Sequence, residues 1–332
     1  MDPVIATHLS ALELGELKQF NKLGVIPLFV SENDGPEYLT LTEALDQDLL
    51  TVTEVGSGGS VPDLKATNKS GRPVLLLDGE ELTGAKQNRV LNTTILLKEK
   101  SETIIPVSCT EQGRWSGISE TLKGTDHVLA GTMRMAKTAS VSHSLKRKRS
   151  FESDQGEMWG DIKGLDCCLE VDSPTGAMRD IFESRRTTLD EYVNEFKCVP
   201  DQKGLLVFIG DKIAGLDTLS RTSAYGTIHP KLVKSYAIDA LVPRRTRAPE
   251  PSVTQARDFL KEASECKEKK YESVGYGWDH RLEGKTAVGS ALVHQGKVIH
   301  MALFPVAEVD RLGPMARYGR RRGFRMWPDR SI

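Results

Sequence analysis

The sequence has few cysteines, no long apolar run and almost no net charge, and each absence removes a class of protein. The five cysteines among 332 residues include no C-x-x-C pair, and their number is odd, so neither a disulfide framework nor a cysteine zinc cage is indicated. No stretch approaches the roughly 18 apolar residues of a membrane-spanning helix, and residues 1–12 lack the cationic and apolar regions of a secretory signal. These absences predict a soluble protein of the reducing cytoplasm, with no membrane partner.

Charges of both signs nearly cancel, with 45 Lys and Arg against 46 Asp and Glu. No overall field therefore favours nucleic acid or a membrane surface. The end of the chain differs, because residues 311–332 hold one acid, Asp329, and seven arginines. The arginines are Arg311, Arg317, Arg320, Arg321, Arg322, Arg325 and Arg330. Aromatic residues interleave with them, a composition suited to binding RNA or an acidic protein, although such a segment is also typical of a solvated tail.

Motifs for metals and cofactors are also missing. The sequence has no H-x-H, H-E-x-x-H or acidic calcium-loop pattern, so it predicts neither a metal site nor a cofactor. Cys109 as a nucleophile would need a neighbouring base, and none of the seven histidines is tied to it by spacing.

Apolar runs separated by short polar turns predict strands in the first third of the chain. They cover residues 24–30, 49–55, 61–67, 73–77, 90–97 and 103–109. Antiparallel pairing is expected, because parallel neighbours need a crossover of a dozen or more residues. Thr40 and Glu43 have the spacing of a capping box and predict a brief helix.

Helical patterns follow Trp115, and strand patterns return later. Predicted helices cover residues 154–162, 173–183 with Pro174 in the first turn, 188–196 with Thr188 as cap, and 229–241, and another begins at the Ser252/Gln255 capping box. Strands are expected at 204–209 and in a hairpin of 287–293 with 297–304. The fold class predicted is α+β, with an antiparallel β-rich N-terminal half, a helical middle and a mixed α/β C-terminal half.

Three parts follow from these patterns. Residues 1–125 form a β-rich part that carries the main polar motifs, and residues 126–310 form a helical and α+β part packed on it as one continuous globular unit. Residues 311–332 form the flexible Arg-rich tail. The pattern does not predict an oligomeric state.

The stretch from Gly79 to Trp115 concentrates polar and charged groups between segments that must be buried. The candidate site residues within it are Glu80, Lys86, Gln87, Arg89, Cys109, Glu111, Arg114 and Trp115. Desolvating such groups without partners costs roughly 2–7 kcal/mol each, so they either pair with one another or face a ligand.

Chemistry distinguishes their expected roles. Neighbouring strand residues point oppositely, so Glu80 and Glu81 cannot both face one pocket, and Glu80 is the preferred candidate. Gln87 and Arg89 together suit a carboxylate, phosphate or sugar hydroxyl. Trp115 beside Arg114 suits a flat ring. The alternative is that these groups form buried networks that hold loops against a sheet without touching a ligand.

These motifs resemble a known family. The segments Gly-Glu-x-x-x-Gly-x-Lys-Gln-Asn-Arg from Gly79 and Pro-Val-Ser-Cys-x-Glu-x-Gly-Arg-Trp from Pro106 are similar to the ARG-and-rhodanese-phosphatase-associated protein domain. The likeness extends roughly over residues 12–304 and is looser after Gly204. The family is largely a domain of unknown function, and its name, which records association with ADP-ribosylglycohydrolase and phosphatase proteins, implies nucleotide or ADP-ribose metabolism by analogy.

Two functions are expected from these observations. The first is binding of a small polar, nucleotide-like or ADP-ribose-like ligand by the candidate residues, with hydrolysis as the reaction if the protein is an enzyme and Glu80 or Glu111 as the catalytic base. The alternative is a non-catalytic interaction or scaffold module whose tail, Arg311 to Arg330, binds RNA or an acidic protein.

Overall fold

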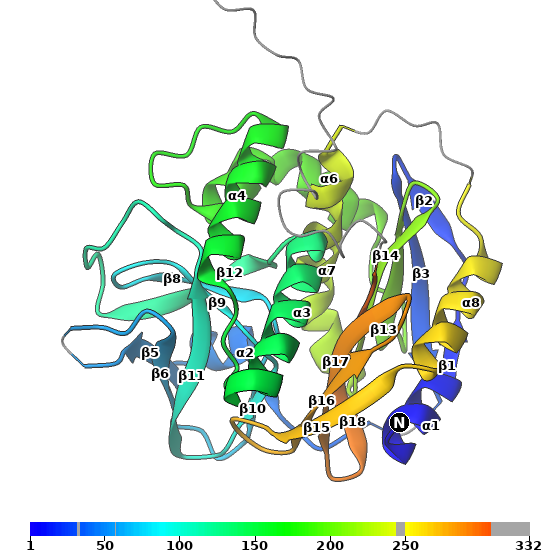
Figure 1. Ribbon diagram of the computed structural model, residues 1–332, viewed down its shortest axis with the longest axis horizontal. Helices are drawn as coiled ribbons and strands as arrows, with labels where there is room; N and C mark the ends of the chain where they lie inside the picture. The colour runs from blue at the N-terminus through cyan, green and yellow to red at the C-terminus, as the bar shows by residue number, and fades with distance from the viewer. Residues whose placement is uncertain (32–33, 57, 244–249, 307–332) are drawn as a thin grey trace, which may run out of the picture.

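The computed structural model describes residues 1–31, 34–56, 58–243 and 250–306, which form a β-barrel and a large sheet with helices packed between them (Figure 1). Among the described strands, the one parallel pair joins β4 to β7, and the others are antiparallel. The predicted α+β class is confirmed. Over these residues, no helix has both the length and the apolar character that crossing a bilayer requires.

Six strands between residues 50 and 128 close into a barrel. In order around the barrel they are β11 (Ser101–Cys109), β6 (Asp63–Asn68), β5 (Leu50–Glu54), β12 (Thr121–Val128), β8 (Glu80–Gly84) and β9 (Arg89–Leu91). Alternate residues of β6 are buried, among them Leu64 and Ala66, because successive side chains of a strand point to opposite faces. They pack with Val52, Leu82 and Ile105 in an apolar interior.

A small sheet adds to this core. It consists of β10 (Ile95–Leu97), β7 (Val74–Leu76) and β4 (Leu39–Thr40), and its apolar side chains belong to the same cluster as the barrel interior. Helix α2 (Leu41–Asp46) follows β4, and the capping box of Thr40 and Glu43 is present as predicted.

The large sheet has nine strands and lies beside the barrel. Its order is β1 (Leu12–Leu14), β3 (Leu23–Val30), β13 (Gly204–Ile209), β14 (Lys212–Leu219), β18 (Lys297–Pro305), β17 (Ala287–His294), β16 (Trp278–Glu283) and β15 (Lys267–Glu272), with β2 (Lys18–Phe20) paired to β3. The sheet therefore draws strands from both sides of residue 125, where the sequence patterns placed a boundary.

Two long helices, α3 (Gly131–Lys148) and α7 (Thr222–Leu241), lie between the barrel and the sheet (Figure 1). Every residue of α7 from Lys231 to Ala240 is buried, as expected for a helix enclosed on all sides. Helices α4 (Gln155–Leu169), α5 (Met178–Ser184) and α6 (Arg186–Glu195) pack beside them.

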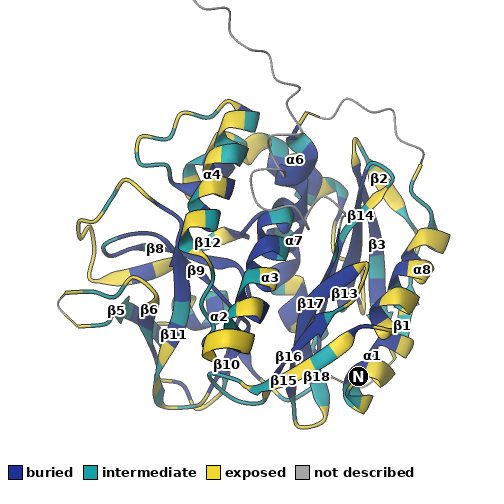
Figure 2. Ribbon diagram, in the orientation of Figure 1, coloured by how far each residue is buried: buried dark blue, intermediate teal, exposed yellow. Residues whose placement is uncertain are grey.

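The other face of the sheet is covered by α1 (Pro3–Ser10) and α8 (Val253–Ser264), whose outer sides are exposed (Figure 2). Helix α8 begins at the predicted Ser252/Gln255 capping box and buries Ala256, Phe259 and Ala263, which share one helical face. The predicted hairpin is also present, as β17 and β18.

Several predicted elements begin or end elsewhere. The helix expected over residues 229–241 already begins at Thr222, and the helix expected over residues 154–162 continues to Leu169. Residues 90–97 are not one strand but β9 and β10, because Asn92, Thr93 and Thr94 between them bond to distant groups rather than to a ladder. The helix expected from residue 173 begins at Met178, since the Ser173 hydroxyl accepts the Ala177 N–H at 2.8 Å and holds a turn there. The helix expected to be capped by Thr188 already begins at Arg186, directly after α5.

Candidate functional site

The two predicted segments meet on the barrel. Strands β9 and β11 pair so that Arg89 lies opposite Cys109, which brings residues 80–89 beside residues 109–115. The candidate side chains do not share one pocket, however. They separate into three groups, centred on Glu80, on Glu111 with Arg114, and on Arg89 with Trp115.

Glu80 is part of a closed ion pair. Its carboxylate accepts a hydrogen bond from Lys231 Nζ on α7 at 2.7 Å and another from the Leu77 backbone N–H at 2.9 Å. Only 1% of the residue is exposed. Gly79 before it has φ = +86°, and a Cβ there would lie 3.0 Å from Val128. The glycine thus permits a tight turn that presents Glu80 to the long helix.

Glu81 points to the opposite side, as strand alternation predicts, and forms a second group that sequence reasoning missed. One oxygen accepts the Thr110 hydroxyl at 2.5 Å, and the other lies 2.8 Å from His127 Nε2. The His127 ring stacks on Phe182 with 4.1 Å between centroids. Burial lowers the pKa of His127, but hydrogen bonds to Asp126 and Glu81 outweigh it and the pKa is raised. The His127 ring is therefore held between two carboxylates.

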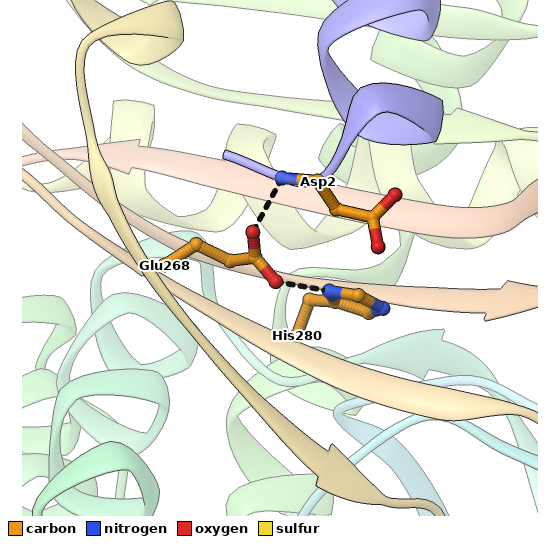
Figure 3. Close-up of side chains that lie close together, drawn as sticks. All are labelled: Asp2, Glu268 and His280. Atoms are coloured by element: carbon orange, nitrogen blue, oxygen red, sulfur yellow. Dashed lines mark hydrogen bonds and ion pairs between the residues drawn. The ribbon is translucent and has the colours of Figure 1, made fainter.

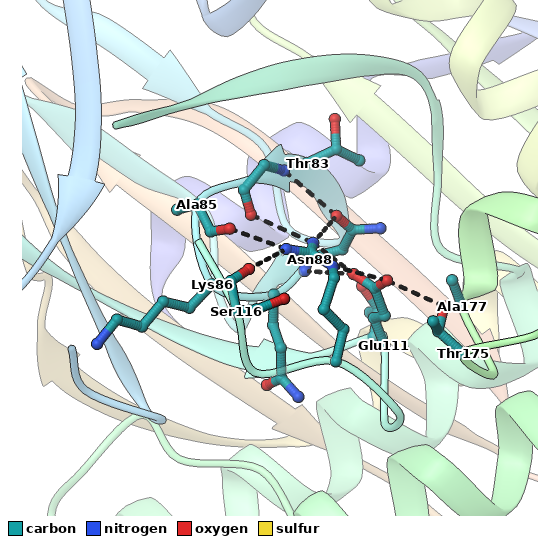
Figure 4. A network of polar contacts seen from close by, with 12 residues as sticks. Thr83, Ala85, Lys86, Asn88, Glu111, Ser116, Thr175 and Ala177 are labelled. Carbon is teal, nitrogen blue, oxygen red and sulfur yellow. Dashed lines mark hydrogen bonds and ion pairs between the residues drawn. The ribbon is translucent and has the colours of Figure 1, made fainter. Parts of the chain in front are cut away.

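Glu111 and Arg114 form a bidentate pair in the loop after β11. The two nitrogen–oxygen distances are 2.9 and 2.6 Å. Glu111 also accepts the Asn88 N–H and the Thr175 hydroxyl, and the remaining Arg114 donors reach Asn88 and backbone oxygens (Figure 4). Burial raises the pKa of Glu111, but hydrogen bonds from Arg114 and Thr175 outweigh it and the pKa is lowered. This network ties the loop after β11 to the turn between β8 and β9 and to the segment before α5.

The Arg89 group differs because its hydrogen bonding is incomplete. Arg89 is fully buried, and Nη1 donates to Gln87 Oε1 at 3.2 Å, whereas Nε and Nη2 have no hydrogen-bond partner among the described residues. The nearest acid is Glu54 at the end of β5, with Oε1 3.9 Å from Nη2. Glu54 Oε2 is likewise buried without a partner in the described chain. Two donor atoms of Arg89 and one acceptor atom of Glu54 are therefore buried without hydrogen-bond partners in the described chain.

Trp115 covers this group from the outside. Its ring is 5.4 Å from the Arg89 guanidinium carbon and 5.7 Å from Lys86 Nζ, and 48% of the residue is exposed. Both distances fit cation–π contacts. An aromatic face reachable from solvent thus lies directly over the incompletely bonded guanidinium.

Electrostatics argue against a reactive thiol at Cys109. Burial raises the pKa of Cys109, and the nearby Arg89 opposes this effect without reversing it. Burial also lowers the pKa of Arg89, against the attraction of Cys109 and Glu54. Because the thiolate is the nucleophile, a raised pKa leaves Cys109 a neutral lining group.

A further buried network lies deeper, and sequence reasoning missed it as well. Arg134 on α3 donates two hydrogen bonds to Asp217 on β14, at 2.9 and 2.5 Å. Tyr236 donates to the same carboxylate at 2.7 Å, and His300 Nε2 lies 3.3 Å from it. Lys137 pairs with Asp78 nearby. These groups are completely or almost completely buried and connect the helices to the sheet and the barrel.

None of the missed groups carried a local sequence signal. Glu54 is separated from Arg89 by more than thirty residues, and Lys231 from Glu80 by about five times as many. Only pairing of the strands and packing of α7 bring them together.

The architecture defines an α+β protein in which a closed six-stranded barrel packs, through two long helices, on a nine-stranded antiparallel sheet. The chain belongs to the family of the ARG and Rhodanese-Phosphatase-superfamily-associated Protein domain, whose model matches residues 11–304. The match includes every predicted site residue and confirms the resemblance in the motifs. Comparison with curated proteins and with solved structures gave no match.

Proposed function

We propose that this protein binds a small polar, nucleotide-like ligand at the Arg89 group, which consists of Arg89, Glu54, Gln87, Lys86, Cys109 and Trp115. The observation that carries the proposal is the buried Arg89 guanidinium with two donors unpaired beneath an exposed tryptophan. Unpaired buried donors are costly, and a ligand that accepts both of them would recover that free energy.

The chemistry of the group selects the ligand. Arg89 Nε and Nη2 require acceptors, whereas Glu54 Oε2 requires a donor. The ligand must therefore offer acceptors to Arg89 and a donor to Glu54. A simple anion offers acceptors alone, so it fits less well than a group with adjacent acceptors and donors. Nucleobase edges and sugar hydroxyls have this character, and Trp115 offers a face for stacking. ADP-ribose contains all of these features and is the ligand class we favour.

The hydrogen bonding of the two predicted catalytic acids, Glu80 and Glu111, favours ligand binding over hydrolysis as the function. Glu80 and Glu111 both have their oxygens occupied by hydrogen bonds from protein groups, and the pKa of Glu111 is lowered. A general base needs a free lone pair directed at the substrate and a pKa near the working pH. Glu80 and Glu111 therefore stabilise the walls of the site, and a hydrolytic step would require another base.

The alternative function depended on the tail from Arg311 to Arg330, which lies outside the described residues. The favoured location remains the cytoplasm, which the odd number of cysteines and the absence of C-x-x-C pairs support.

A thermal-shift screen followed by calorimetric titration tests the proposal, with ADP-ribose, AMP and ribose 5-phosphate as probes. Ligand at a hundredfold excess over Kd adds about 2.7 kcal/mol to the free energy of unfolding, so the melting temperature should rise by several degrees. Trp115→Ala should abolish the shift while the protein stays folded, since Trp115 is half-exposed on a loop.

Trp278→Ala is the matched control, because Trp278 is 42% exposed and lies beneath Lys270, but on the large sheet. It should retain the full shift. Absence of a shift with all three probes, or an equal shift in Trp115→Ala, would contradict the proposal.

A further inference from the structure

A second group of metal-binding side-chain types lies outside the barrel, on the face of the large sheet that α1 covers. Asp2, Glu268 and His280 each offer one potential metal-ligand atom, and these atoms all lie within 4.8 Å of one another. Glu268 connects the other two, since one oxygen accepts the Asp2 backbone N–H at 2.5 Å and the other lies 2.5 Å from His280 Nδ1 (Figure 3).

The fold explains why three residues so distant in sequence converge. Strands β15 and β16 pair with Lys270 opposite His280, so Glu268, two residues before Lys270, points to the same face as His280. Asp2 caps α1, with its Oδ1 accepting the Val4 N–H at 2.9 Å, and α1 packs on this face. Because the three residues are far apart in sequence, no local spacing such as H-x-H marks this group.

His280 gives an independent sign that the group binds a ligand. The residue is completely buried, and its Nε2 atom has no hydrogen-bond partner within the described part of the chain. Nδ1 is held by Glu268, and the Asp2 carboxylate lies on the Nε2 side of the ring (Figure 3). Histidine ligands of metals usually donate their second ring N–H to a carboxylate, which fixes the tautomer and directs the other nitrogen at the ion.

We propose that His280 Nε2 and the Asp2 carboxylate bind a divalent transition-metal cation such as Zn²⁺ or Mn²⁺, with Glu268 positioning the imidazole. Imidazole and carboxylate ligands suit these ions. The two carboxylates beside the imidazole also supply the negative charge that a divalent ion needs. Lys270 lies 3.8 Å from Asp2 Oδ2 and is the competing cation.

The surroundings leave room for further ligands. Asp2 borders a cavity of about 650 Å³ whose lining includes Lys270, Glu272, Trp278 and His294. Of the three residues only Asp2 lines this cavity, so water can approach an ion from the Asp2 side. The cavity is formed by β15 to β17, the start of α1 and Lys98 after β10, and no residue of the Arg89 group lines it.

Calorimetric titration of the full chain with Zn²⁺ and, separately, with Mn²⁺ tests the proposal. We expect one ion per chain, with binding lost in His280→Ala and weakened about 10–100-fold in Glu268→Gln, the size of effect usual for residues that orient a metal ligand. Mn²⁺ separates this site from exposed thiols, since cysteine favours softer ions. Far-ultraviolet circular dichroism verifies that each variant is folded.

Two further variants serve as controls. Glu265→Gln removes an exposed acid two residues before β15 that does not line the cavity, and it should leave the affinity unchanged. Lys270→Gln removes the competing cation and should strengthen binding severalfold, a result that a purely structural role for the group would not produce. Failure of either ion to bind the wild-type chain, or equal binding by His280→Ala, would overturn the proposal.

Discussion

Individual residues show that similar buried charges have different roles according to how fully they are paired. Glu111 and Arg114 form hydrogen bonds with each other and with several backbone groups, so their network has a structural role. Arg89 is more deeply buried but retains two unpaired donors. Incomplete hydrogen bonding beneath a half-exposed aromatic ring, rather than residue type, therefore marks the candidate ligand-binding residues.

Glu111→Gln should lower the free energy of unfolding by about 2 kcal/mol, because Arg114 would lose a charged bidentate partner. Urea denaturation measures the change, and Glu120→Gln, at an exposed position in the same loop, should stay within about 0.5 kcal/mol of wild type. An equal effect of the two substitutions would contradict a structural role for the Glu111–Arg114 pair.

The stability difference between wild type and Glu111→Gln should also depend on pH. The pKa of Glu111 in the folded protein is below its ordinary value of 4.5, so the unfolded chain takes up a proton first as the pH falls. The ionised Glu111 carboxylate contributes its full stabilisation above about pH 4.5, and this contribution is lost as the pH falls through the pKa of Glu111 in the folded protein. Urea denaturation at pH 7 and below pH 4 should show a smaller stability difference between wild type and Glu111→Gln at the lower pH. A difference that does not change with pH would argue against this role of the Glu111 carboxylate.

At this scale the sequence predicted part of the site. The concentration of buried polar groups between residues 79 and 115 was predicted from their place between apolar segments, and the opposite orientations of Glu80 and Glu81 followed from alternation. Their partners Lys231, His127 and Glu54 could not be predicted, because each pairing depends on tertiary packing across many residues. A single sequence carries no local signal for such distances.

Among the elements, those with a local chemical signal were predicted best. Both capping boxes are present where the Ser/Thr-x-x-Glu/Gln spacing placed them, because the motif is satisfied within one turn. Boundaries at residues 92–94 and 173–177 were predicted incorrectly. At residues 92–94, hydrogen bonds to distant residues replace the pairing of one continuous strand. At residues 173–177, a turn held by the Ser173 hydroxyl makes the helix begin further along the chain.

Ser252→Ala should cost about 1 kcal/mol of stability, because the Ser252 hydroxyl accepts the Gln255 N–H at the start of α8. Ser264→Ala, at the exposed opposite end of the same helix, should cost much less. Urea denaturation of both variants provides the measurement. If the two serines proved equivalent, the capping box would have no energetic role in α8.

At the scale of the whole molecule, a buried polar network joins the barrel, the central helices and the sheet. Asp217 on β14 receives hydrogen bonds from Arg134 of α3 and Tyr236 of α7, and His300 of β18 links it to Thr94 beside the barrel. Because these side chains come from both β units, unfolding of one unit would leave buried charges of the other unpaired. The network therefore couples the stability of the two units.

Asp217→Asn should destabilise the protein by about 3–5 kcal/mol, because it leaves the buried Arg134 charge without its carboxylate. Asp258→Asn, an exposed substitution on α8, is the matched control.

Unfolding followed by circular dichroism and by tryptophan fluorescence should remain a single coincident transition in wild type. Separate transitions of the two probes in wild type would show that barrel and sheet are not coupled.

The most direct test of the central claim uses Trp115 as its own reporter. With Trp159, Trp278 and Trp327 replaced by Phe, all emission comes from Trp115, since the chain has four tryptophans. Titration of this variant with ADP-ribose should give saturable quenching with the calorimetric Kd, and adding Arg89→Lys should weaken that binding at least about tenfold because the planar fork of donors is lost. Emission that stays constant through saturating ADP-ribose, AMP and ribose 5-phosphate would contradict ligand binding at the Arg89 group.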